Sequence, residues 1–113
     1  MKNKIAIPVD NSGKLDPHFG HCKYFAIHEV EDKIIVTDEI VQPPPHEPGV
    51  LPNWLADLGI TEVLAGGMGN RAIQHFNKLG INVFTGAPEM DARELINGFL
   101  NDTIEFSANY CDH

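Results

Sequence analysis

The sequence contains no apolar run long enough to span a bilayer, so a membrane partner is not expected. Basic residues are few: eight Lys and Arg stand against 16 Asp and Glu, which gives a formal net charge of −8. Such a surface repels phosphate backbones and disfavours general nucleic-acid binding. Cysteine is also scarce. Cys22 and Cys111 are the two cysteines, and in a reducing compartment they are expected to be thiols rather than a structural disulfide.

The N-terminal stretch MKNKIAIPVD has too few apolar residues for a signal peptide and is predicted to be a first strand. A cytoplasmic location is therefore expected. The length of 113 residues and the 42% hydrophobic share predict one globular domain over residues 1–113. The tail from about residue 101 shows no sustained period, and a flexible tail is one interpretation of it.

The chain is organised around the stretch from Glu62 to Ala87, which is predicted to be strand, glycine turn, helix and strand. An apolar run at 63–65 is typical of a strand buried on both faces. Asn70 is the expected N-cap of the helix, and Gly80 occupies the position of a C-terminal capping glycine. Because both connections are short, the two strands are expected to be parallel neighbours joined by a right-handed crossover.

The remaining elements extend this unit. A first strand is predicted at Lys4–Val9, an antiparallel hairpin at Tyr24–Glu31 and Lys33–Val41, a helix over 50–58, and a third helix from Met90 or Asp91. Asp91 and Glu94 resemble a capping box, and Gly98 is expected to weaken the third helix slightly. The predicted fold is α/β: a five-stranded mixed sheet flanked by helices on both faces, with its first, fourth and fifth strands parallel.

Histidine and cysteine form the first candidate site. The predicted metal ligands are His18, His21 and Cys22 in the first loop, His46 in the loop after the proline run, and Cys111 and His113 at the C-terminus. Imidazole and thiolate bind zinc, copper and iron, and thiolate also binds iron–sulfur clusters. The first loop follows the first strand at its carboxyl end, where open α/β sheets usually bind ligands. Each pattern is weak alone, so unrelated surface residues remain the alternative; His28 and His75 are interpreted as structural or solvent-facing.

A glycine turn forms the second candidate site, for an anionic cofactor, and comprises Gly66, Gly67, Met68, Gly69, Asn70 and Arg71. A turn that opens a helix presents free backbone N–H groups and the positive end of the helix dipole, which suit phosphate or a molybdenum oxyanion. The turn is neither a Walker loop nor a dinucleotide fingerprint. The alternative is that a tight strand-to-helix turn simply needs glycine.

Carboxylates give a third, weaker pattern. Asp10 ends the first strand, but the glycine turn supplies no second carboxylate for a two-magnesium centre. Asp10 is therefore predicted to cap the loop. No Ser-His-Asp spacing is visible, and the adjacent His21 and Cys22 are poorly placed to act as a base and its nucleophile.

Four stretches together carry a family resemblance: IAIPVD, HFGHCKYFAIHEV, AGGMGNRAIQHFNKLGINVFTGA and the terminal CDH. With them the chain resembles the dinitrogenase iron–molybdenum cofactor biosynthesis family, the small NifX-like and NifB C-terminal-like domains. The resemblance implies a three-layer ribonuclease-H-like fold and a carrier of iron–molybdenum cofactor precursors or related clusters. The C-x-x-x-C-x-x-C run of the full cofactor synthase is absent, so that radical chemistry is excluded.

The sequence therefore predicts a non-catalytic carrier of a metal–sulfur cluster, with a zinc or iron ion as the alternative cargo. Its expected partners are the cluster and a protein that donates or accepts it, and the chain itself is expected to be a monomer or weak homodimer. Two other hypotheses stay open. One is a metal-dependent hydrolase that uses Asp10, and the other is a metal-free module that binds an anion or a partner.

Overall fold

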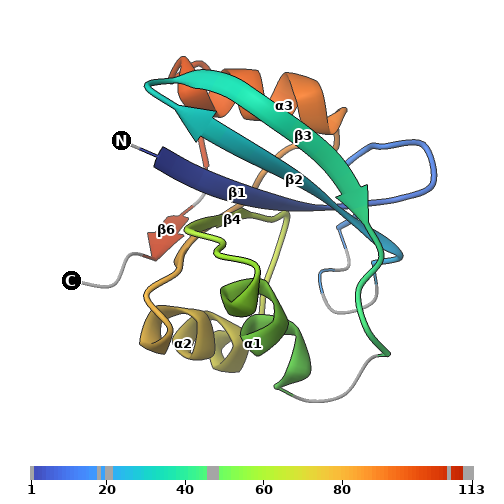
Figure 1. Ribbon diagram of the computed structural model, residues 1–113, viewed down its shortest axis with the longest axis vertical. Helices are drawn as coiled ribbons and strands as arrows, with labels where there is room; N and C mark the ends of the chain where they lie inside the picture. Colours follow the sequence, from blue (N-terminus) through green and yellow to red (C-terminus); the bar gives the residue numbers. More distant parts are fainter. Residues whose placement is uncertain (1, 18, 20–21, 46–48, 107, 111–113) are drawn as a thin grey trace.

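The computed structural model describes residues 2–17, 19, 22–45, 49–106 and 108–110. Six strands and three helices follow one another in this part of the chain (Figure 1). They are β1 Lys2–Val9, β2 Tyr24–Glu31, β3 Ile34–Val41, α1 Val50–Asp57, β4 Glu62–Leu64, α2 Asn70–Lys78, β5 Asn82–Thr85, α3 Ala92–Leu100 and β6 Ala108–Tyr110. None of these helices is both long enough and apolar enough to cross a bilayer.

The strands form one mixed sheet in the order β3-β2-β1-β4-β5-β6. β1, β4 and β5 are parallel, and β2 runs antiparallel to both of its neighbours. All five predicted strands are present with the predicted directions. The hairpin turns at Asp32 and Lys33, whose φ angles of 52° and 67° are both positive, as a two-residue hairpin turn of right-twisted strands requires.

Helices cover both faces of the sheet and give three layers (Figure 1). α1 and α2 pack on one face, where Leu55, Ile73 and Phe76 join a core with residues of β1, β2, β4 and β5. α3 packs on the other face through Ala92, Leu95 and Ile96. The alternation of β2 divides its side chains between these cores, with Phe25 on the α1–α2 face and Ala26 on the α3 face.

The sheet has one short strand beyond the five predicted. β6 pairs antiparallel with β5 at the sheet edge, and it has only three residues, too few to show a period. Between α3 and β6, Ile104 and Phe106 pack into the core on the α3 face, and the rings of Phe84 and Phe106 lie 5.6 Å apart.

Two helix ends differ from the sequence-based expectation. The N-cap of α2 is Gly69 rather than Asn70, and Asp91 is the N-cap of α3 but its side chain makes no capping hydrogen bond. Gly80 has a φ of 78° just after α2, as predicted for a helix-ending glycine.

Gly98 has a packing role. A Cβ atom at this position would lie 2.1 Å from Cδ1 of Ile104, so the third helix carries glycine because the following segment packs directly on its backbone.

Candidate functional site

The carboxyl ends of the parallel strands bring three loops together. The loop after β1 reaches the glycine turn after β4, because a Cβ atom at Gly66 would lie 3.6 Å from Cα of Pro17. The loop after β5 joins them through a hydrogen bond of 2.9 Å, in which the Gly86 N–H donates to the Gly66 carbonyl. The glycine turn therefore lies between the other two loops, at the sheet edge where α/β proteins usually bind ligands.

Two glycines of this turn, Gly67 and Gly69, are required neither by a positive φ nor by a crowded backbone among the described residues. Gly66, Gly67 and Gly69 all have φ angles outside the positive region that favours glycine. A Cβ atom on Gly67 or Gly69 would meet no described atom within 4 Å. The expectation that a tight turn needs glycine for its backbone conformation therefore fails at both positions. The two residues leave an open, bare stretch of backbone.

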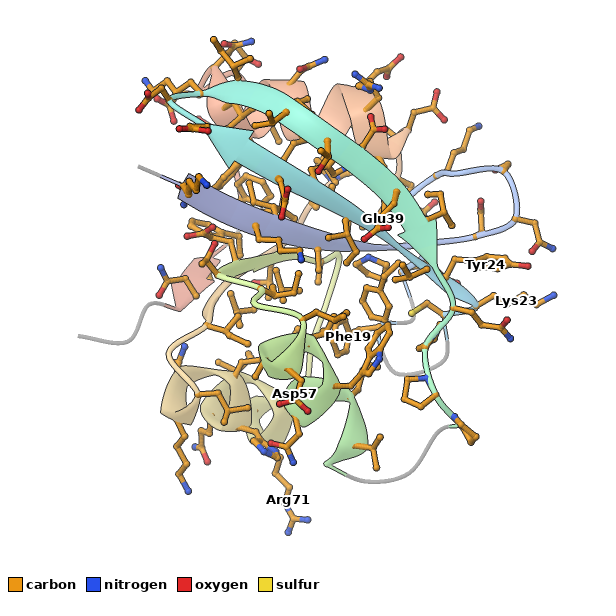
Figure 2. The ribbon with its side chains drawn as sticks, viewed as in Figure 1. Phe19, Lys23, Tyr24, Glu39, Asp57 and Arg71 are labelled. Atoms are coloured by element: carbon orange, nitrogen blue, oxygen red, sulfur yellow. The ribbon has the colours of Figure 1, made fainter. Side chains whose placement is uncertain are left out.

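This stretch leads directly into α2. Gly69 makes no side-chain capping hydrogen bond, so the first N–H groups of α2 have no side-chain acceptor among the described residues. Met68 packs into the core on the α1–α2 face and anchors the turn. The exposed side chain of Arg71 points away from the sheet, outward from α2 (Figure 2). Arg71 therefore adds positive charge beside the turn without closing over it.

Cys22 lies in the loop after β1, and its thiol is buried. It joins the α1–α2 core together with Phe19, whose ring lies 5.6 Å from that of Phe76 and 5.8 Å from that of Phe25. Figure 2 shows Phe19 below the sheet, on the side of α1. Burial, with a smaller contribution from the negative charge of Asp16, raises the pKa of the Cys22 thiol to about 12. At neutral pH the metal-free protein therefore holds a protonated thiol.

The other five predicted metal ligands lie outside the described residues: His18, His21, His46, Cys111 and His113. Within the described part of the chain, no three His, Cys, Asp or Glu side chains are grouped so that they could hold a metal ion. Cys111 and His113 follow β6 in the sequence, so the direction of this strand matters for them. Ala108 pairs with Thr85 and Tyr110 with Val83, so β6 runs away from the edge that carries the glycine turn.

Asp10 caps the loop after β1, as predicted. Its Oδ1 atom accepts hydrogen bonds from the backbone N–H and hydroxyl of Ser12, at 2.8 and 2.7 Å, and from the Lys14 N–H at 3.2 Å. The hydroxyl of Ser12 is the main cause of a lowered pKa for the Asp10 carboxyl. The carboxylate is fully exposed, and its accepting oxygen is occupied by its own turn.

His28 is buried, with 4% of its surface exposed, and neither ring nitrogen has a hydrogen-bond partner in the described part of the molecule. Its cross-strand neighbour Asp38 is paired with Arg93 of α3. Burial lowers the pKa of His28, and Arg93 adds to this effect while Asp38 opposes it. His28 is thus a neutral core histidine, consistent with the structural role predicted for it.

Comparison with known proteins identifies the family of this chain. Residues 1–102 match the family described as dinitrogenase iron-molybdenum cofactor. The chain belongs to this family. The match covers the sheet as far as β5, all three helices and the glycine turn, and it confirms the resemblance found in the sequence.

Three known proteins match most of this chain. The uncharacterized protein MJ0580 of Methanocaldococcus jannaschii is 34% identical over 107 residues, which span 90% of this chain and 89% of MJ0580. The crystal structure of PH0822 superposes with a TM-score of 0.85 at 33% identity, covering 92% of this chain and 94% of that one. The apo form of the orange protein from Desulfovibrio gigas has a TM-score of 0.77 at 23% identity, covering 94% and 93%. This last likeness establishes the fold alone.

Proposed function

We propose that this protein is a non-catalytic carrier whose cargo is a metal–sulfur cluster of the iron–molybdenum cofactor type, bound at the carboxyl edge of the sheet. A single zinc or iron ion is the alternative cargo. The description of the family, dinitrogenase iron-molybdenum cofactor, supports the chemical class of the cargo. The strand order β3-β2-β1-β4-β5 with an antiparallel β2 supports the ribonuclease-H-like label, which we propose with it. We expect the carrier to act in the cytoplasm.

The observation that carries the proposal is the bare backbone at Gly67 and Gly69. Neither glycine has a positive φ, and a Cβ atom on either one would meet no described atom within 4 Å. We infer that a ligand approaches the backbone closely at these two positions, since glycine is the residue that permits such an approach. The N–H groups at the start of α2 and the charge of Arg71 suit an anionic cluster.

The loop after β1 would supply the protein ligands. Cys22 lies in this loop with His18 and His21, and we propose that His46 joins them from the loop before α1. Binding of a metal by Cys22 requires loss of the thiol proton, so cargo loading at neutral pH should release a proton. We propose that Cys111 and His113 contribute least to the ligand set, because β6, which precedes them in the chain, runs away from the edge that carries the glycine turn.

The test is elemental analysis of protein purified without oxygen and of protein reconstituted with iron, sulfide and molybdate. We expect stoichiometric metal in the wild type and its loss in Cys22→Ser, whereas the matched Cys111→Ser variant retains it. Gly67→Ala and Gly69→Ala should keep the wild-type melting temperature and yet bind less metal. A wild type that stays free of metal after reconstitution would overturn the carrier proposal and favour the metal-free binding module.

A substitution at Asp10 distinguishes the carrier proposal from the hydrolase hypothesis. A metal-dependent hydrolase needs this carboxylate for its metal and loses turnover in Asp10→Asn. The carrier proposal expects unchanged metal content in Asp10→Asn, because an amide oxygen can accept the same hydrogen bonds from Ser12 and Lys14.

A further inference from the structure

The outer edge of β3 is unpaired in the part of the chain that the structure describes. β3 stands at one end of the sheet order, so β2 pairs with one side of it only, and no described loop forms a backbone hydrogen bond with its other side. The N–H and C=O groups along that side are available to another extended strand. Ile34, Val36 and Ile40 of this strand are 68%, 57% and 58% exposed. Large apolar residues exposed on an edge strand indicate an interaction surface.

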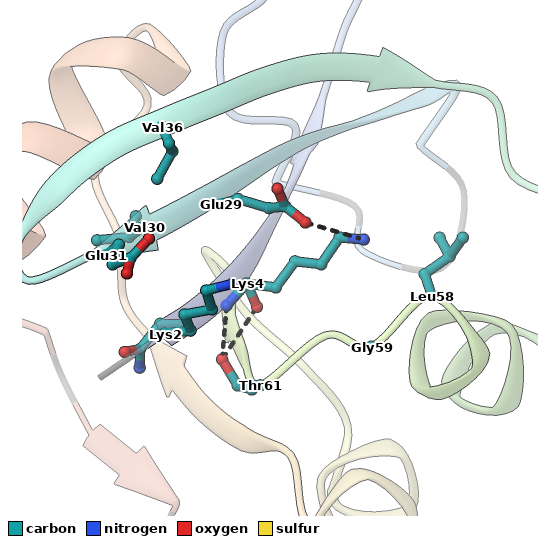
Figure 3. A pocket seen from close by; sticks show the side chains of 10 residues that line it. Lys2, Lys4, Glu29, Val30, Glu31, Val36, Leu58, Gly59 and Thr61 are labelled. Atoms are coloured by element: carbon teal, nitrogen blue, oxygen red, sulfur yellow. Dashed lines mark hydrogen bonds and ion pairs between the residues drawn. The ribbon is translucent and has the colours of Figure 1, made fainter.

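The amino half of β3 is unsuited to pairing with a further strand. The register of β3 with β2 skips Val36, which lies between the paired residues Ile35 and Thr37. Such a bulge bends an edge strand and interrupts regular pairing. Val36 lines a cavity of about 370 Å³ at the amino end of β1 and β2 (Figure 3). The regular part of the free edge is therefore Thr37–Val41, in which every residue pairs with β2.

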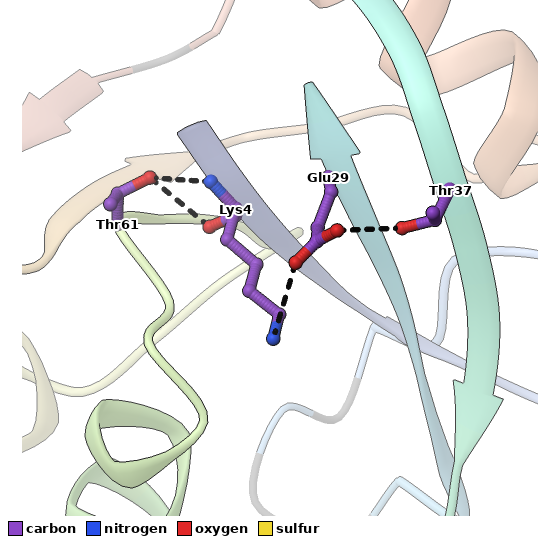
Figure 4. Close-up of polar contacts among 4 residues, drawn as sticks. All are labelled: Lys4, Glu29, Thr37 and Thr61. Carbon is purple, nitrogen blue, oxygen red and sulfur yellow. Dashed lines mark hydrogen bonds and ion pairs between the residues drawn. The ribbon is translucent and has the colours of Figure 1, made fainter. Parts of the chain in front are cut away.

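One carboxylate of this regular part lacks a partner. Glu29 of the neighbouring strand is satisfied within the chain, because the Nζ atom of Lys4 lies 3.8 Å from its Oε1 and the hydroxyl of Thr37 donates a hydrogen bond of 3.0 Å to its Oε2 (Figure 4). Glu39 is exposed on β3 (Figure 2), and its cross-strand neighbour is the apolar Ile27. It forms no ion pair or hydrogen bond with a described side chain. Glu39 therefore offers its charge to a residue from outside the chain.

The regular part of β3 ends at the same edge of the sheet as the proposed cargo site. Phe25 of β2 pairs with Pro8 near the end of β1 and with Val41 at the end of β3, so both strands end at the carboxyl edge. The glycine turn follows β4, three strand spacings from β3, which is about 14 Å. A chain docked on β3 can reach this turn with the residues that flank its docked strand.

We propose that Thr37–Val41 accepts an extended basic segment of another protein as a further strand of the sheet. The segment places a lysine or arginine opposite Glu39 on the α1–α2 face and an apolar residue opposite Ile40 on the α3 face. Main-chain hydrogen bonds supply the affinity, and these two side-chain pairs supply the preference. That the partner donates or accepts the cargo rests on the carrier function proposed above, whereas the docking itself needs no bound metal.

Charge selects a basic segment over a second copy of this chain. An antiparallel two-fold pairing of β3 with itself over Thr37–Val41 is centred on Glu39, so it sets the two Glu39 carboxylates opposite each other. Like charges directly opposite are destabilising. An acidic segment meets the same repulsion, to which the net charge of −8 adds. A lysine or arginine instead gives Glu39 the partner that it lacks within the described chain.

The test follows the backbone-amide NMR spectrum of the metal-free protein as a short capped peptide of alternating valine and lysine is added. The amides of Thr37–Val41 should shift most and should exchange with solvent more slowly. The same peptide with glutamate in place of lysine should cause no shift. Glu39→Lys should weaken binding of the lysine peptide about five- to tenfold and should bind the glutamate peptide instead. The matched control Glu105→Lys makes the same charge change at an exposed residue before β6, at the opposite edge of the sheet, and should bind like the wild type.

Three results would overturn the proposal. The first is that the shifts avoid β3, and the second is that Glu105→Lys weakens binding as much as Glu39→Lys, which would mean attraction to the net charge alone. The third is that the wild type without peptide pairs with itself through β3. If Glu39→Lys does not fold, as judged by circular dichroism, Glu39→Gln replaces it and should also weaken binding of the lysine peptide. Metal content is not part of the readout, so failure here leaves the carrier proposal untouched.

Discussion

The burial of Cys22 predicts that its thiol reacts very slowly in the native, metal-free protein. The thiolate is the reactive form, and its fraction is set by the pKa. Burial raises this pKa from its ordinary value of 9.0 to about 12. At pH 8 about one Cys22 in 10⁴ is then a thiolate, against about one in ten for an ordinary thiol. The expected rate of reaction is therefore about 10³-fold lower than that of an exposed cysteine.

The assay is reaction with Ellman's reagent at pH 8, followed by absorbance. Cys111→Ser leaves Cys22 as the remaining thiol, since the sequence has two cysteines. The unfolded protein in guanidinium chloride serves as the internal control and should react at the ordinary rate. Asp16→Asn should speed the native reaction modestly, because the Asp16 charge is the smaller cause of the raised pKa.

A native rate within about tenfold of the unfolded rate would refute this reasoning, because the thiol would then be neither desolvated nor shielded. A slow rate that tracks the global unfolding equilibrium would instead show that Cys22 reacts only from opened molecules. Either result shows whether a metal would displace the Cys22 thiol proton in the native protein or only in opened molecules.

Three further predictions concern stability. Gly98→Ala should destabilise the protein by about 1 kcal/mol in urea unfolding, since overpacking against Ile104 costs about 1–3 kcal/mol and alanine returns at most about 1. In an Ile104→Ala background the same change should stabilise by about 0.5–1 kcal/mol, and an unchanged sign would contradict the packing argument. The folded-state pKa of His28 is lowered, so the free energy of unfolding should fall as pH drops below about 6.5, and His28→Leu should flatten this dependence. Asp10→Ala should lower the melting temperature more than Asp10→Asn, which keeps an acceptor for Ser12.

The sequence was sufficient for those parts of the fold that depend on local patterns. The hairpin, the parallel strands and the three helices each carry a period or a turn signal that short windows detect. β6 could not be predicted, because its three residues are held by pairing with β5 at long range. The role of Gly98 was missed for the same reason. Helix propensity is a local property, whereas Ile104 contacts Gly98 only after the chain turns back.

The position of the glycine turn was predicted from the sequence, but the reason for its glycines was not. Gly66, Gly67 and Gly69 follow a buried strand and predicted the turn. The ordinary explanation for them was that the backbone conformation of a tight turn requires glycine. The φ angles and the open space at Gly67 and Gly69 remove that explanation, and neither quantity is visible in a sequence. The raised pKa of Cys22 likewise arises from burial among residues of α2 and β2, which are distant along the chain.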